Sequence, residues 1–227
     1  MTSFRDVLAG LDYHYLVDLL LQVIPALLCI MIHEICHGLA AYALGDRTAA
    51  TQGRLSLNPL HHVDWFGLVM LAFFHIGWAK PVSVNMRNFR NPKRGMAITA
   101  LAGPISNFLL AAVMLFFFGL LYAPLYDKKW GYDLLVLLES IAYLSVSLGL
   151  FNLIPFPPLD GSKVLFSLLP DKAYMKLMFL ERYGMIVLIV LVVLLNRVLD
   201  VIPVAAASEA VFRWFFRIAK FANTLTM

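Results

Sequence analysis

The sequence predicts an all-α polytopic membrane protein with about four to six transmembrane helices, a short re-entrant segment and small β-strand or hairpin elements. The first indication is composition, since 61% of the 227 residues are hydrophobic, 14% are charged and the mean hydropathy is +0.80. Soluble domains carry about 25% charged residues. The second indication is a set of apolar runs, each near or above the length of about 20 residues that a helix needs to cross a bilayer.

Four of these runs are candidate spans, at Leu16 to Leu44, Met96 to Tyr122, Leu134 to Ile154 and Tyr183 to Val201. At a rise of about 1.5 Å per residue, the first run exceeds a hydrocarbon core of about 30 Å, so part of it must protrude or tilt. A fifth apolar stretch, Trp65 to Trp78, is shorter and contains two glycines. Its length and composition indicate a re-entrant or buried segment.

The remaining elements are short. Alternating residues at Arg54 to Leu57 and at Pro81 to Val84, among many Gly, Pro and Asn residues, predict brief strands with turns. Near the C-terminus, Arg213, Arg217 and Lys220 lie opposite an apolar face. This pattern predicts an amphipathic helix that lies on the membrane surface or docks on the bundle.

Charge sets the expected orientation and excludes one class of partner. Seven Lys and Arg residues lie between Gly45 and Gly95, and four lie between the third and fourth runs. The turn between the second and third runs carries only two, and the segment before the first run carries one. Because positive residues favour cytoplasmic loops, we expect an outside N-terminus. The net charge of +4 is spread over loops without a clustered basic face, so a nucleic-acid partner is not expected.

The stretch HEICH, residues 33 to 37, carries the first candidate chemistry. His33 and His37 are four positions apart on a predicted helix, so both imidazoles face the same side and can bind one metal ion. Glu34 is held beside that ion without having to bind it. This H-E-x-x-H pattern is incomplete alone, because a catalytic zinc needs a third protein ligand and an open position for water.

The candidate third ligand is Asp160, in the Pro-rich stretch FNLIPFPPLDG just past the cytoplasmic end of the third run. His33 and His37 lie roughly 10 to 17 Å inside the cytoplasmic end of the first helix. A Pro-broken segment at that depth is tolerated where it is buried in protein or lines water, which a metal site provides. We therefore expect the three side chains to meet around one cation.

HEICH, GWAKPVSVN, AGPISN and NLIPFPPLDG, in this order and spacing, resemble the site-2 protease family of zinc metalloproteases that cut transmembrane segments. The likeness runs from about Ile32 to Val164. It implies an intramembrane endopeptidase that hydrolyses peptide bonds in or near transmembrane segments, as in regulated intramembrane proteolysis. The site that it implies has one Zn²⁺ held by His33, His37 and Asp160, with Glu34 as general base and acid and Asn152 holding substrate or the oxyanion.

The resemblance also implies a loop that folds back into the membrane near the site. The substrate-binding residues expected on this basis are Gly77, Pro81, Val82, Ser83, Val84 and Asn107. The whole chain, 1–227, is expected to be a single intramembrane metalloprotease domain, with a catalytic core at about 16–165 and a C-terminal helix and amphipathic tail at 183–227. The expected location is the plasma membrane of a prokaryote, with the site nearer the cytoplasmic side.

The residues themselves support this chemistry. A zinc ion can polarise the scissile carbonyl and its water, and Glu34 can take the proton and later give it to the leaving amine. A helical substrate has to unwind locally, and the edge of Pro81 to Val84 can hold it extended by strand addition.

Two other classes stay open. One is a non-catalytic metal-binding membrane protein, a transporter or scaffold, although a transporter should carry more ionisable residues along its spans. The other is a prenyl-protein protease, whose third ligand is usually a Glu on a helix. The sequence leaves the oligomeric state and the identity of the transmembrane substrate undetermined.

Overall fold

The computed structural model describes residues 13–58, 61, 62, 64, 80–184, 186–188, 190 and 203–226. Its long helices are α2 (Tyr13–Ala43), α5 (Pro92–Leu125), α6 (Lys129–Leu153) and α10 (Pro203–Asn223). The shorter elements are α3 (Thr48–Thr51), η2 (Met86–Asn88), α7 (Asp160–Ser167), α8 (Asp171–Leu180) and η3 (Glu181–Tyr183). The described part of the chain is therefore mostly helical, as the apolar runs predict.

Within the described part of the chain, three helices are long and apolar enough to cross a membrane: Val23–Ala43 of α2, all of α5 and all of α6. They coincide with the first three predicted runs, which are confirmed. The fourth predicted span, Tyr183 to Val201, falls largely outside the described residues, and Trp65 to Trp78 falls outside them entirely. The described residues thus contain three candidate spans, and the predicted total of four to six is not confirmed.

The prediction of short strands is wrong for both pieces, since neither forms a strand in the described residues. Arg54 lies in a turn after α3, and its N–H donates to the Ala49 carbonyl. In the other piece, the Val82 N–H donates to a Glu34 carboxylate oxygen. These backbone donors are satisfied by a turn and a side chain, so no ladder with a neighbouring strand is needed.

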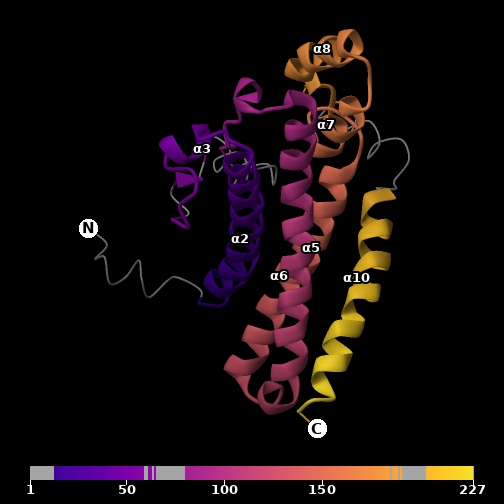
Figure 1. The fold of residues 1–227 in the computed structure, drawn as a ribbon. Helices are drawn as coiled ribbons and strands as arrows, with labels where there is room; N and C mark the ends of the chain where they lie inside the picture. Colours follow the sequence, from indigo (N-terminus) through magenta and orange to yellow (C-terminus); the bar gives the residue numbers. More distant parts are fainter. Residues whose placement is uncertain are drawn as a thin grey trace, which may run out of the picture.

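Helix α5 lies at the centre of the bundle, packed between α2 and α10 and along α6 (Figure 1). Its buried residues Leu115 and Phe118 meet Leu135 and Val146 of α6 in the main apolar core. A smaller cluster joins α2 to the same pair of helices. Because many large apolar side chains on the outer surfaces of α2, α5 and α6 are exposed, this surface suits contact with lipid.

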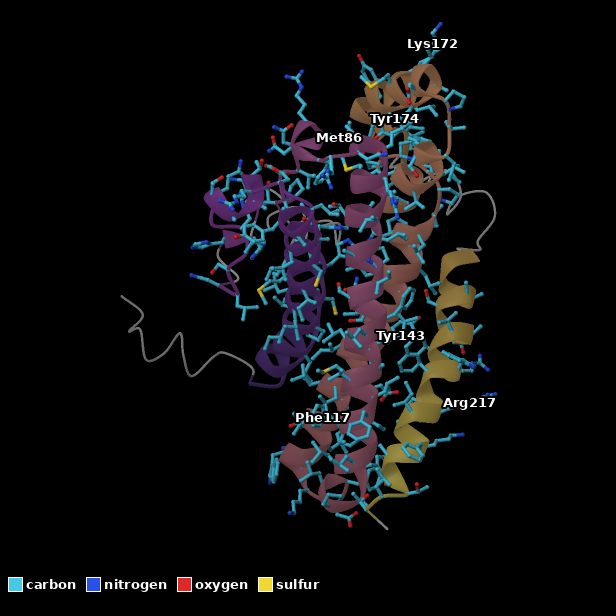
Figure 2. All side chains as sticks on the ribbon, in the orientation of Figure 1. Met86, Phe117, Tyr143, Lys172, Tyr174 and Arg217 are labelled. Carbon is cyan, nitrogen blue, oxygen red and sulfur yellow. The ribbon has the colours of Figure 1, made fainter. Side chains whose placement is uncertain are left out.

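The predicted amphipathic C-terminal helix is confirmed as α10, and it docks on the bundle. It packs against α5 and α6 on the side opposite α2 (Figure 1). The contact is close because a Cβ on Gly119 would lie 2.0 Å from the Ala219 carbonyl oxygen. The basic residues face the other way, and Arg217 points away from the bundle (Figure 2).

Candidate active site

Three side chains from two distant segments converge at one end of the bundle. His33 and His37 come from α2, and Asp160 is the first residue of α7. The Nε2 atoms of the two imidazoles are 2.9 Å apart and lie 3.1 Å and 3.0 Å from Asp160 Oδ2. All three residues are at least 92% buried, with exposed fractions of 5%, 8% and 6%. The predicted meeting of these residues is therefore confirmed, and their atoms form a cluster that can hold a metal ion.

The protonation pattern of this cluster suits a cation. His37 Nδ1 lies 2.7 Å from the Thr99 carbonyl oxygen. Since a carbonyl only accepts, Nδ1 carries a proton, and in the neutral imidazole this leaves Nε2 with a lone pair aimed at Asp160 and His33. Lone pairs converging with a carboxylate in a buried site repel one another unless a positive charge lies between them. Two imidazoles and one carboxylate are also a common zinc ligand set.

Asn107 contacts Nδ1 of His33, just as the Thr99 carbonyl contacts Nδ1 of His37. It is fully buried on α5, and its amide nitrogen is placed 3.1 Å from His33 Nδ1, while its carbonyl oxygen has no partner. The oxygen and nitrogen of an Asn amide have nearly the same shape, so the group can turn over within the same space. With the amide turned over, the oxygen accepts from a protonated Nδ1, so Nε2 of His33 is also free to bind metal. Asn107 thus lies behind a ligand and not at the cavity surface.

Two glycines make room for the ligands. A Cβ at Gly103 of α5 would lie 2.5 Å from His37 Cε1 and Nε2 and 2.6 Å from His33 Cε1. A Cβ at Gly161 would lie 2.2 Å from the Leu153 carbonyl oxygen, where α7 begins against the end of α6. Any side chain at these positions would push the imidazoles or Asp160 out of place.

The electrostatics around Asp160 favour its ionised form. Burial raises the pKa of this carboxyl, but the contacts with His33 and His37 and the charge of Lys163 outweigh it and hold the pKa well below its usual range. The Lys163 ammonium donates to Asp160 Oδ1 at 3.2 Å and lies 3.9 Å from a Glu181 carboxylate oxygen. One oxygen of Asp160 is thereby occupied, and the other faces the imidazoles.

Glu34 lies beside the cluster and contacts the segment between residues 80 and 85. Its Oε2 accepts from the Val82 N–H at 2.8 Å. A cavity of about 720 Å³ opens here. Its lining includes Glu34, the three clustered residues, Asn152, Pro81, Val82, Val84, Lys163 and Glu181.

The remaining predicted site residues are placed as follows. The Asn152 amide lines the cavity and donates to the Leu148 carbonyl one turn earlier. Ser83 is exposed and is not part of the cavity wall. Gly77 lies outside the described residues. Sequence reasoning missed Thr99, Gly103, Lys163 and Glu181, although the Gly-Pro pair at 103 and 104 inside a helix was an available signal of close packing.

A buried cluster of two histidines and an aspartate, with a glutamate beside it in a bundle of apolar helices, defines a metallopeptidase-type site in an integral membrane protein. The sequence profile of peptidase family M50 matches residues 121–195, which include Asn152 and Asp160. The chain belongs to this family, the site-2 proteases, and is a metalloprotease by that membership.

Several bacterial relatives support the assignment. YwhC of Bacillus subtilis, named as a candidate zinc metalloprotease, is 37% identical over 179 residues, or 75% of this chain and 79% of the relative. Rip2 of Mycolicibacterium smegmatis, named in the same way, is 27% identical over 196 residues, or 85% of this chain and 68% of the relative. Rip2 of Mycobacterium tuberculosis is 28% identical over 169 residues, or 73% and 63% of the two chains. No solved structure matches the chain.

Proposed function

We propose that this chain is a zinc-dependent intramembrane endopeptidase that hydrolyses peptide bonds in or near transmembrane segments of membrane proteins, as a step of regulated intramembrane proteolysis. The observation that carries the proposal is the convergence of His33, His37 and Asp160 within a bundle of membrane-spanning helices. The names of the bacterial relatives favour zinc as the ion.

The ligand set suits catalysis better than mere metal storage. The Lys163 ammonium donates to Asp160 Oδ1, which favours monodentate binding of a metal ion through Oδ2. His33, His37 and Asp160 would then hold the ion with three protein atoms, which is the number found in catalytic zinc sites that leave a position for water. Zinc in that position supplies Lewis-acid activation of the water and of the scissile carbonyl.

Glu34 performs the proton transfers in this scheme. It adjoins the ligand His33 and lines the same cavity, so its carboxylate can accept the proton of the attacking water and return it to the leaving amine. Asn152, whose amide borders the cavity, is positioned to hold the substrate or the oxyanion. Both roles fall to side chains carried by long helices, Glu34 on α2 and Asn152 on α6.

The segment Pro81 to Val84 is the proposed holder of the unwound substrate. Val82 and Val84 line the cavity next to Glu34. Because alternate residues of an extended backbone face the same way, an extended segment here would turn the Val84 N–H and C=O to the same side as those of Val82, where they could pair with a substrate backbone. Val84→Pro removes this donor and leaves the Val82–Glu34 contact in place. We expect Val84→Pro to reduce cleavage with zinc retained and Val84→Ala to reduce it less; equal effects would contradict backbone pairing.

The decisive experiment compares two Glu→Gln variants in proteoliposomes with a tagged single-span peptide as substrate. Glu34→Gln should reduce cleavage by at least about 100-fold, because the general base is lost, while zinc content stays at the wild-type level. Glu139→Gln makes the same change on α6 away from the cavity and should leave cleavage unchanged. Cleavage by Glu34→Gln at the wild-type rate, with zinc bound, would refute the assignment of the base.

The ligand set is tested in the same preparation. Asp160→Ala should lose zinc, whereas Asp133→Ala, at the other end of α6, should keep it. Full zinc content in Asp160→Ala would remove this residue from the ligand set.

The proposed location is the plasma membrane of a prokaryote, with the site nearer the cytoplasmic side. The concentration of Lys and Arg residues around α3, η2 and α8 supports this orientation. In a Cys36→Ser background, Lys172→Cys places a thiol on the exposed surface of α8. An impermeant maleimide should label it in inverted vesicles and not in intact cells, and the opposite result would reverse the orientation.

A further inference from the structure

Asp46 is a carboxylate outside the candidate metal cluster that is completely buried. It follows Gly45, whose φ of +104° ends α2 in a conformation that favours glycine. The sequence around it contains an ordinary helix end, so nothing local requires a buried charge here. A buried carboxylate must have its oxygens hydrogen-bonded, and the partners reveal what it does.

The two oxygens of Asp46 have different partners. Oδ1 accepts from the N–H and hydroxyl of Thr48, which is a local contact at the start of α3. Oδ1 also accepts from the Asn88 amide at 2.7 Å, and Oδ2 accepts from the Asn85 N–H at 2.7 Å. The last two contacts join the end of α2 to a segment about 40 residues further along the chain. The Oδ2 contact takes no part in the local contact with Thr48.

The same segment is attached to α2 a second time, at Glu34. The Val82 N–H donates to Glu34 and the Asn85 N–H donates to Asp46, so two carboxylates of one helix region hold the segment at both ends. Both donors are backbone groups in partly buried contacts, and removal of either acceptor would leave an N–H without its protein partner. Val82 at the first attachment and Val84 between the two attachments line the cavity.

The far end of the segment has its own support from α8. The Tyr174 hydroxyl donates to the Met86 sulfur at 3.3 Å, and the two side chains lie at the same end of the molecule in Figure 2. Lys93 at the start of α5 pairs with Asp171 of α8 at 2.8 Å. η2 is therefore held by α8 at Met86 and by Asp46 at Asn88, whereas the Val82 and Asn85 N–H groups donate to Glu34 and Asp46.

We propose that Asp46 is a positioning residue for peptide hydrolysis, which through Asn85 fixes the segment 82–85 beside Glu34 and so sets where the substrate backbone lies. This inference rests on the proposed function, because it assigns Asp46 to the segment that holds the substrate. Asp46 does not touch the reacting atoms. Its effect is on the placement of Val82, Val84 and the Glu34 carboxylate.

The test uses Asp46→Asn, which keeps the size of the side chain but replaces one acceptor oxygen by a donor. Whichever way the amide turns, one backbone N–H loses its acceptor. We expect KM for the transmembrane peptide to rise at least tenfold, kcat to fall less, and zinc content to stay unchanged. Amide hydrogen exchange in residues 80–88 should become at least tenfold faster, while exchange in α5 and α6 stays the same.

Thr48→Ala is the matched control, because it removes a contact of the same carboxylate without touching residues 82–88. It should keep the wild-type KM and the wild-type exchange rate of residues 80–88. An Asp46→Asn protein with wild-type KM and exchange would overturn the inference, and so would an equal effect of Thr48→Ala.

Asn88→Ala covers the case in which Asp46→Asn does not fold. Asn88 is exposed and gives up only its contact with Asp46, so this variant should fold, raise KM about threefold and speed exchange of residues 80–88. Wild-type behaviour of Asn88→Ala would then count against the inference. If the wild-type protein cleaved no transmembrane peptide, the proposed function would fail, whereas the exchange measurement would still decide whether Asp46 holds the segment.

Discussion

Gly103→Ala tests how closely the helix α5 is fitted to the two imidazoles. The added methyl would lie 2.5 Å from His37 Cε1 and Nε2 and 2.6 Å from His33 Cε1. Carbon atoms in contact are normally about 3.5 to 4.0 Å apart, so the rings must move by about 1 Å. The His37 ring cannot retreat freely because its Nδ1–H is bonded to the Thr99 carbonyl.

The expected loss follows from that displacement. Metal sites keep ligand distances within about 0.2 Å, so a shift of about 1 Å takes the imidazoles out of range of a shared ion. Misplacement by about 1 Å costs about 100-fold in catalysis, which corresponds to about 2.7 kcal/mol. We therefore expect zinc affinity, measured by chelator competition, and kcat/KM for a transmembrane peptide each to fall by about 100-fold. The helix itself should not weaken, because Ala favours helix over Gly by about 1 kcal/mol.

Gly119→Ala is the matched control, with the same substitution at the other end of α5. Its methyl would meet the Ala219 carbonyl oxygen at 2.0 Å, so it should loosen α10 and lower the thermal stability. Zinc content per folded molecule should not change. Wild-type zinc affinity in Gly103→Ala would refute the close fit, and zinc loss in both variants would show that the effect is general unfolding.

Two further predictions concern the surroundings of the ligands, and a third concerns Asp46. Asn107→Leu fills a similar volume without a hydrogen bond to His33, so zinc affinity measured by chelator competition should fall about 10- to 100-fold. Lys163→Met removes the donor to Asp160 Oδ1, and we expect kcat to fall about tenfold with most of the zinc retained. Burial raises the pKa of Asp46, but hydrogen bonds from Thr48, Asn85 and Asn88 outweigh it and hold the pKa below its ordinary value of 3.8. Its contribution to stability is present above pH 3.8 and is lost as the pH falls through the lower pKa of the folded protein, which thermal melts of wild type and Asp46→Asn should show.

Each of these predictions has a contrary outcome. Unchanged zinc affinity in Asn107→Leu would mean that His33 is oriented by its helix alone. If Lys163→Met lost as much zinc as Asp160→Ala, Lys163 would be required for binding the ion and not only for setting its geometry. An identical decline in melting temperature on acidification of wild type and Asp46→Asn would show that other carboxyl groups govern acid stability.

The predictions that held depend on local or one-dimensional properties of the chain. Apolar length alone marks α2, α5 and α6 as membrane-spanning helices, because a bilayer sets the number of residues required. Helical periodicity alone places His33 and His37 on one face. Asp160 could be matched to them because a membrane turns sequence position into depth, so two residues at equal depth in neighbouring helices are candidates for contact.

The predicted strands failed because alternation describes a single segment, whereas a strand requires a partner. Residues 82 to 85 have an alternating pattern, yet their donors at Val82 and Asn85 pair with Glu34 and Asp46. Asn107 was expected to bind substrate, but its burial behind His33 depends on how α5 is rotated against α2. Neither pairing nor helix rotation can be obtained from composition or periodicity.

By itself, the sequence determines the class of this protein, its spanning helices and the residue types of a metal site, because hydrophobic length and helical spacing act within single segments. Only the tertiary structure decides which glycine makes room for the imidazoles, which carbonyl sets the proton on His37, and which carboxylate holds residues 82 to 85. These features depend on distances between atoms of different helices. Such distances are set by side-chain packing and hydrogen bonding across the bundle, to which segments far apart in the sequence contribute together.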